Sequence, residues 1–179
     1  KQGVLIIDKS IFSSNAADSS AAIEFNKYST VTSLVINSIF HNNVSNELND
    51  PSHPNKEIFT VGQEGSTPTI DIVNSAFIKN SGGVRFAESG EQSSIINTVF
   101  VNNSESDVVA ENSHIPTIQN SYVPSIQGPT FNEDVITTGD LGFVDITNND
   151  FRLTSASVLI DSGKVIETLG NKHQYGNYP

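Results

Sequence analysis

The sequence predicts an all-β fold that is built as a parallel β-solenoid of repeated coils. Two observations predict it: the balance of residue types and a motif that recurs along the chain. The 179 residues include 19 Ile and 16 Val but only 7 Leu and 8 Ala, and β-branched side chains favour strands over helices. Nearly a third of the chain is Asn, Ser or Thr, which favour turns over helix interiors.

One motif recurs along the chain and fixes the architecture. It consists of an aliphatic pair, Asn, a small hydroxyl residue, an apolar residue and an aromatic residue, with a second Asn three positions later. It runs over residues 35–40, 72–77 and 95–100, with a longer first copy at 6–12 and a degenerate last copy at 118–122. The aromatic positions are Phe12, Phe40, Phe77, Phe100 and Tyr122, and their spacings are 28, 37, 23 and 22 residues. A period of 22 or 23 with two longer copies is typical of a solenoid with inserted loops.

Stacked coils place equivalent side chains above one another, about 4.8 Å apart. We therefore expect inward residues such as Ile36, Ile39 and Phe40 to stack on their counterparts, and the five aromatic positions to form one core column. We expect an asparagine ladder at a bend between strands, and a similar one from Asn43, Asn80 and Asn103 at the following turn. The members of the first ladder are Asn37, Asn74, Asn97 and Asn120. The alternative is that these asparagines are only turn formers in an antiparallel sandwich.

The Phe-x-x-Asn endings, with Gly82-Gly83-Val84 after the third, resemble right-handed parallel β-helix proteins. They are most similar to the repeats of polymorphic outer-membrane autotransporter adhesins. The stretches 142–145, 149–153 and 155–163 resemble the closing segment of secreted bacterial β-helix proteins. The resemblance implies a right-handed β-helix of about five coils in the pectate-lyase-like superfamily. It also implies a bacterial origin and a secreted or cell-surface location, but no particular activity.

Length, charge and composition limit the classes of partner. We expect one domain, with coils over residues 1–127 and the closing segment over 128–179. The formal net charge of −11 makes nucleic acid an unfavourable partner, because phosphate binding needs clustered cations. No stretch has the roughly 20 apolar residues of a membrane span, so we expect no membrane insertion. The chain has no Cys and no Met; we expect no disulfides, and a fragment or processed product that is monomeric.

Candidate catalytic residues are few. The resemblance implies that a polysaccharide lyase on this fold would need a cation, Ca²⁺ or Arg/Lys, to neutralise a uronate, and a base to remove the neighbouring proton. Arg85 lies between two apolar residues of a strand and Lys79 is near it, while Asp71 alternates with apolar residues. We expect all three on the outer surface, as a possible ligand surface or as ordinary solvated residues. Arg152 belongs to the closing segment and is expected to be structural.

One acidic column is a possible Ca²⁺ site. Glu88 and Glu111 are 23 residues apart, which is one coil, and Glu64 precedes them by a similar distance. Carboxylates stacked at this spacing repel one another unless a cation lies between them. The alternative is that they are solvated surface acids. The histidines have no metal-ligand spacing, and we expect them, His41 included, in solvated turns. No cofactor is required by the sequence.

Two functions remain open from the sequence. The first is a binding or adhesion scaffold for an extended polysaccharide or a surface protein, because solenoids present long polar faces. The second is the C-terminal part of a polysaccharide lyase or glycoside hydrolase with catalytic coils elsewhere. Whether the chain is an enzyme is left undecided by its residues.

Overall fold

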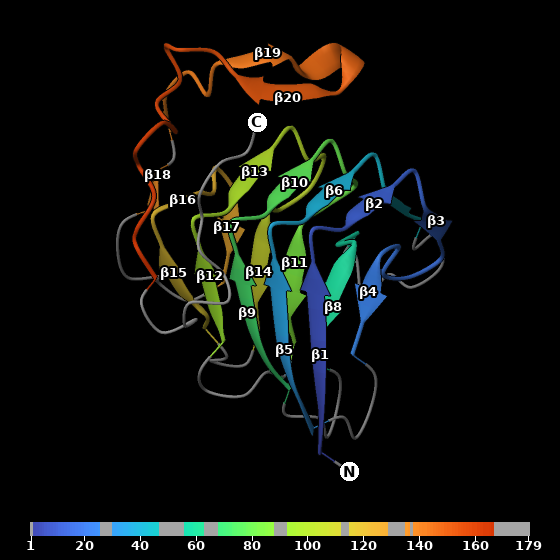
Figure 1. Ribbon diagram of the computed structural model, residues 1–179. Helices are drawn as coiled ribbons and strands as arrows, with labels where there is room; N and C mark the ends of the chain where they lie inside the picture. The colour runs from blue at the N-terminus through green and yellow to red at the C-terminus, as the bar shows by residue number, and fades with distance from the viewer. Residues whose placement is uncertain are drawn as a thin grey trace.

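Three parallel sheets run along the molecule, and the chain visits them in turn. The computed structural model describes residues 2–25, 30–46, 56–62, 68–87, 93–111, 115–128, 135–136 and 138–166. In this part of the chain every long-range strand pair is parallel except one hairpin near the C-terminus. The antiparallel sandwich alternative is therefore wrong, and the fold is all-β with the character of a β-solenoid (Figure 1).

The strands of each sheet follow one another in chain order. The first sheet holds β1 (Gln2–Asp8), β5 (Thr30–Ile36), β9 (Thr69–Val73), β12 (Ser94–Ile96) and β15 (Thr117–Gln119). The second holds β2 (Ile11–Ser13), β6 (Ile39–His41), β10 (Ala76–Ile78), β13 (Val99–Val101), β16 (Ser121–Tyr122) and β18 (Val135–Ile136). The third holds β4 (Ile23–Glu24), β8 (Phe59–Val61), β11 (Val84–Phe86), β14 (Val108–Ala110) and β17 (Ile126–Gln127). We use "coil" for one passage through the three sheets.

Two further strand pairs lie outside these sheets. Strand β3 (Ala16–Ala17) pairs with β7 (Val44–Ser45) at the turn after the second sheet. Strands β19 (Phe143–Asp145) and β20 (Asp150–Leu153) form the antiparallel hairpin, which is closed by the 3₁₀ turn η1 (Ile146–Asn148). The hairpin lies across the second sheet, at the top of Figure 1. No helix among the described residues has the length and apolar character needed to cross a bilayer.

The phenylalanines stack in one column through the core. Phe12, Phe40, Phe77 and Phe100 occupy equivalent register positions of β2, β6, β10 and β13. Their ring centroids are 4.7, 4.6 and 4.8 Å apart, with the ring planes within 11° of parallel. The last three rings are fully buried, and Phe12 is half-buried at the end of the stack. Because 4.7 Å is also the spacing of paired strands, the parallel register itself imposes ring stacking.

Tyr122 does not belong to this column, which corrects the sequence expectation. Strand register pairs Tyr122 with Val99, an outward position, and the next residue, Val123, is fully buried. The prediction took the aromatic residue of the last copy as its core position and so placed that position one residue too early. Similarly, Val35 rather than Ile36 joins the core cluster, and Ile39 faces outward beside the buried Phe40.

Asparagine side chains form a continuous hydrogen-bonded ladder at the turn after the second sheet. The Oδ1 atom of Asn80 accepts both the backbone N–H and the Nδ2 group of Asn43, at 2.9 and 3.0 Å. Its own Nδ2 donates to the Oδ1 of Asn103 and to the carbonyl of Phe40. Asn15 makes the same two bonds to Asn43 one coil earlier. Each amide thus joins three coils, and the backbone groups of a buried turn are satisfied.

The other asparagine column is a set of turn formers, not a ladder. Asn37, Asn74, Asn97 and Asn120 all have positive φ, between 44° and 54°, a conformation that asparagine tolerates better than most residues. No side-chain hydrogen bond joins one of these four to another in the described part of the chain. The ladder expected here is absent because the left-handed backbone turns these side chains to the outer corner. There, Asn37 donates to Asp8, and Asn97 and Asn120 bind residues 162–164.

A second ladder, made of hydroxyl side chains, runs next to this corner. It was not predicted, although every copy of the motif contains a small hydroxyl residue. The Oγ of Ser38 donates to the carbonyl of Ile36 and accepts the backbone N–H of Ser10. Ser75, Thr98 and Ser121 repeat this pattern in later coils. All four residues are buried, so the small hydroxyl residue of each copy satisfies the backbone where two strands meet.

Gly83 allows two coils to approach closely at the third sheet. A Cβ added at this residue would lie 1.9 Å from the carbonyl oxygen of Asp107. No side chain fits that space, which explains the Gly at this position. Asp107 itself is buried, and its carboxylate accepts hydrogen bonds from the Asn103 side chain and the Ser125 backbone. Burial raises the pKa of Asp107, and these two hydrogen bonds oppose that rise.

Replacing a ring inside the column should cost more than replacing the ring at its end. We expect Phe77→Ala to lower the free energy of unfolding by about 3–5 kcal/mol, since the buried ring is stacked on both faces. Phe12→Ala, the matched control, removes a half-buried ring with one stacking partner and should cost clearly less. Urea denaturation measures both, and equal losses would contradict the continuous column.

The Asn80 amide should be intolerant of a substitution that keeps its shape. Asn80→Asp retains the acceptor for Asn43 but removes the donor to Phe40 and Asn103 and buries a charge. We expect a loss of at least about 2 kcal/mol at neutral pH, with partial recovery at acid pH, where the carboxyl group is neutral. Denaturation of the unmodified protein and of Asn80→Asp, each at neutral and at acid pH, measures the loss in free energy of unfolding. A loss that does not change with pH would speak against a buried charge as its cause.

Candidate functional site

The three residues singled out as a possible ligand surface lie in three different sheets. Asp71 is in β9 of the first sheet and Arg85 is in β11 of the third. Lys79 directly follows β10 of the second sheet. The structure therefore does not bring them together into one site, because residues close in sequence are carried around the coil to different faces.

Arg85 is held by an acidic partner from the neighbouring coil. Its Nε and Nη2 atoms donate to the two carboxylate oxygens of Glu111 at 3.2 and 2.9 Å. The exposed fractions of the two side chains are 15% and 33%. A planar two-point contact of this kind satisfies the guanidinium group and neutralises its charge. Arg85 is thus already engaged, and a uronate would have to displace Glu111 to reach it.

The acidic column is only partly described. Glu111 directs its carboxylate to Arg85, whereas Glu64 and Glu88 lie outside the described residues. Among the described His, Asp and Glu side chains, no group of three is arranged to hold a metal ion. The Ca²⁺ hypothesis therefore gains no further support from Glu111, whose carboxylate meets a cation supplied by the protein itself.

The outer face of the first sheet presents a row of side chains in strict register, three of them polar. Asp71 pairs with Leu34 on one side and with Ser94 on the other, and Ser94 pairs with Thr117. The Ser94 hydroxyl donates to the Asp71 carboxylate. We call these four residues, Leu34, Asp71, Ser94 and Thr117, the Asp71 row. Thr117 is exposed and the other three are half-buried, so the row crosses four strands and presents the carboxylate and hydroxyl groups of Asp71, Ser94 and Thr117 on three of them.

The outer face of the second sheet is covered by the chain itself. Ile78 and Val101 are buried together with Leu141 of the C-terminal segment, and Phe143 and Phe151 of the hairpin pack against them. Lys79 reaches over to donate from its Nζ to the carbonyl of Thr147. Lys79 is therefore part of this contact and not of an open ligand surface. Where the hairpin covers this face, we expect little area to be left for a ligand.

His41 lies at the edge of the same contact and is not a solvated turn residue. Its ring is 5.4 Å from that of Phe151, edge to face. Burial, and then the positive charge of Lys79, lower the pKa of His41 below its ordinary value. Protonation therefore favours the unfolded or undocked state. The folded protein therefore has its full stability above the ordinary pKa of histidine. It loses part of that stability as the pH falls through the lowered pKa of His41.

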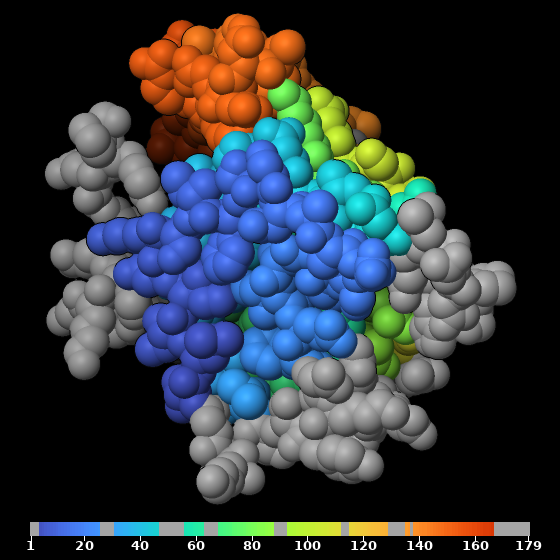
Figure 2. Space-filling view, turned by 90° about the vertical axis from the view of Figure 1, so that its right-hand side faces the viewer, coloured from blue at the N-terminus to red at the C-terminus, as the bar shows by residue number. Residues whose placement is uncertain are grey.

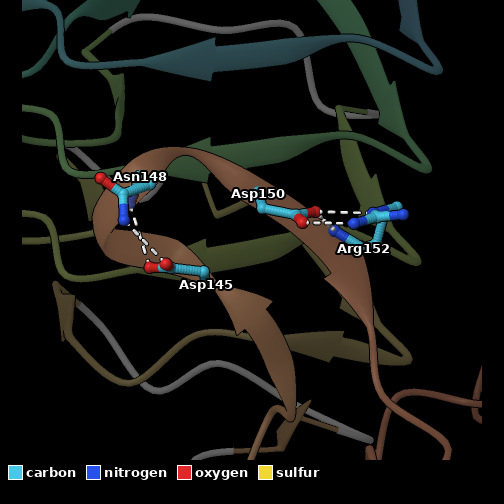
Figure 3. A network of polar contacts seen from close by, with 4 residues as sticks. All are labelled: Asp145, Asn148, Asp150 and Arg152. Atoms are coloured by element: carbon cyan, nitrogen blue, oxygen red, sulfur yellow. Dashed lines mark hydrogen bonds and ion pairs between the residues drawn. The ribbon is translucent and has the colours of Figure 1, made fainter.

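The hairpin carries its own network of charges (Figure 3). The carboxylate of Asp145 accepts from the backbone and side-chain nitrogens of Asn148, which lowers the pKa of Asp145. Two hydrogen bonds from Arg152 lower the pKa of Asp150 to about 2. The Asp145–Asn148 contacts span the hairpin turn, whereas the Arg152 side chain is 79% exposed and pairs with Asp150 within one strand. Because the carboxylates of Asp145 and Asp150 both have hydrogen-bond partners within the hairpin, this network is a poor candidate for a ligand site.

The residues after the hairpin are fastened to the outer corner between the first and second sheets. The side-chain amide of Asn97 donates to the carbonyl of Lys164 and accepts its backbone N–H, at 2.9 and 2.7 Å. Asn120 donates to the carbonyl of Ser162. Asn97 and Asn120 therefore have a second role that the sequence does not reveal. Their side chains bind the backbone of an extended segment of the same chain.

Comparison with known proteins gave no relative: no family model, curated protein or solved structure matches this chain.

The pKa of His41 should report the docking of the hairpin. We expect an NMR titration of the His41 ring to give a pKa below the ordinary histidine value in the unmodified protein. Phe151→Ala should raise it toward that value, because burial is the main cause of the shift. Lys79→Gln, the matched control, should raise it less, because charge is the second cause. A Phe151→Ala protein with an unchanged pKa would show that the hairpin does not cover His41.

Proposed function

We propose that this chain is a secreted or cell-surface module, a right-handed parallel β-helix of about five coils in the pectate-lyase-like superfamily, that binds an extended carbohydrate. The Asp71 row is the observation that carries the proposal. Its side chains lie on neighbouring strands about 4.8 Å apart, in a register set by strand pairing. The hydroxyl and carboxylate groups of Asp71, Ser94 and Thr117, repeated at this spacing, suit a hydroxyl-rich polymer, because they can donate to and accept from its hydroxyl groups.

The charge of the chain limits the kind of carbohydrate. With a formal net charge of −11 and a carboxylate in the row itself, a polyuronate would be repelled at low ionic strength. Arg85, the residue that could offset this repulsion on the third sheet, is bound to Glu111. A neutral polysaccharide is therefore the ligand class that this surface favours. A surface protein remains the partner if no glycan binds, and Ca²⁺ is not needed for this mode of binding.

Affinity electrophoresis in gels that contain neutral polysaccharides tests the proposal. We expect the protein to be retarded by at least one neutral polymer, and the double variant Asp71→Ala/Ser94→Ala to bind at least about tenfold more weakly. Arg152→Ala, the control, changes a side chain on the hairpin and should bind normally. Retardation of the protein and the double variant to the same extent, or of neither, would overturn the proposal.

The alternative activity has its own assay. A polysaccharide lyase or glycoside hydrolase would release unsaturated or reducing ends from pectin, alginate or chondroitin. Product formation by this chain, lost in Arg85→Ala, would replace the binding function with catalysis. We expect no product, because the guanidinium group of Arg85 is neutralised in place.

A further inference from the structure

A strap of chain, residues 162–164, lies on the outer corner between the first and second sheets. It is drawn in red beside β15 in Figure 1, and it follows the hairpin that sits on the coils, in orange, in Figure 2. The side-chain amide of Asn97 binds both the N–H and the carbonyl of Lys164, and Asn120 binds the carbonyl of Ser162. Because one amide holds both backbone groups of Lys164, this residue has a fixed place relative to the first sheet.

The side chain of Lys164 extends onto the outer face of the first sheet. Its Nζ donates to the Oε1 of Gln119 at 3.0 Å. Gln119 follows Thr117 by two residues in β15, and Ile118 between them is fully buried. Since side chains alternate across a strand, Gln119 and Thr117 share the outer face. The ammonium group of Lys164 is therefore placed beside the end of the Asp71 row.

The charge of this ammonium group is not neutralised within the described part of the chain. Lys56, Arg85 and Arg152 each pair with a carboxylate, whereas no described carboxylate forms an ion pair with Lys164. The residue is exposed, and Gln119 takes one of its three donors. A cation that is held at its backbone and at its tip can thus bind an anion without first breaking an ion pair.

We propose that Lys164 is a specificity residue of the Asp71 row, and that it binds one carboxylate group carried by an otherwise neutral polysaccharide. The proposal rests on the carbohydrate-binding function of the row and adds the chemistry of its ligand. The neutral sugars lie along Asp71, Ser94 and Thr117. A carboxylate beyond Thr117 accepts hydrogen bonds from the donors of Lys164 that Gln119 leaves open, and these charge-assisted bonds fix the register of the polymer along the row.

The spacing of charges on this face selects a polymer with few acidic groups. Asp71 lies in β9, two strands from β15, which is about 10 Å at the usual strand spacing. Electrostatic screening acts over about 8 Å at physiological ionic strength, so a carboxylate at Lys164 is little repelled by Asp71. A polymer with an acid on every sugar would place another carboxylate against Asp71, and the net charge of −11 would repel it further.

Affinity electrophoresis with matched polymers tests the proposal. Dextran and hydroxyethyl cellulose are each used uncharged, with carboxymethyl groups on few sugars, and with carboxymethyl groups on most sugars. We expect the sparsely charged form of at least one polymer to bind at least about fivefold more tightly than its uncharged form at low ionic strength. The densely charged form should bind more weakly than the sparse one, and added salt should reduce the preference.

Three variants locate the preference, which is measured as the ratio of the affinities for the sparsely charged and uncharged forms. Lys164→Gln removes the charge and should bring this ratio close to one. Asn97→Gly tolerates the positive φ of its turn but releases the backbone of Lys164, so the ratio should fall although the lysine remains. Lys56→Gln, the matched control, removes a lysine that pairs with Glu105 and precedes β8 of the third sheet, and should keep the ratio.

Three results would overturn this inference alone. One is that the uncharged and sparsely charged forms bind equally, while Asp71→Ala/Ser94→Ala still weakens both. Another is that the densely charged form binds most tightly. The last is that Lys56→Gln lowers the ratio as much as Lys164→Gln, because net charge and not a placed lysine would then set the preference. Absence of binding to every polymer would instead overturn both this inference and the carbohydrate-binding function.

Discussion

The parallel register between successive coils is the constraint on which the rest of the structure depends. Once β6 pairs with β10 so that Phe40 faces Phe77, every inward side chain meets its equivalent at the strand spacing. A buried polar residue of the motif can then bond to its own equivalent in the next coil. Asparagine does this through one acceptor and two donors, and serine through its hydroxyl and the backbone. The buried polar residues of the motif are therefore as much part of the core as the rings.

Fixing the inward positions leaves the outward positions free to differ between sheets. On the second sheet, Ile78 and Val101 are apolar, and the C-terminal segment covers them. On the first sheet, three of the four residues of the Asp71 row are polar, and the row is partly exposed. On the third, Arg85 and Glu111 join neighbouring coils by an ion pair. One repeat thus supplies a covered face, a polar face and a charged contact, and any specific function resides in these outward residues.

The sequence was most informative where the repeat is strict. The spacing of Phe12, Phe40, Phe77 and Phe100 predicted a column that the structure contains. The sequence misled at Tyr122, because the prediction followed aromatic character instead of the Asn120-Ser121 pair that sets the register. The ladder and turn-forming asparagines could not be told apart, since both are an Asn at a bend and only backbone φ distinguishes them. The cover over the second sheet also escaped prediction, because an outward Ile looks like an inward Ile when strands are three residues long.

The ladder has a direction, and this explains why it ends on a carboxylate. Each asparagine donates toward the following coil and accepts from the preceding one, so the chain of donors must end on an acceptor. Asp107 provides it: a carboxylate accepts only, and it takes the Nδ2 of Asn103 and the N–H of Ser125. The burial that raises its pKa is the cost of ending the ladder inside the protein. Asn15 donates to Asn43 in the same sense, so all the described members of the ladder point toward Asp107.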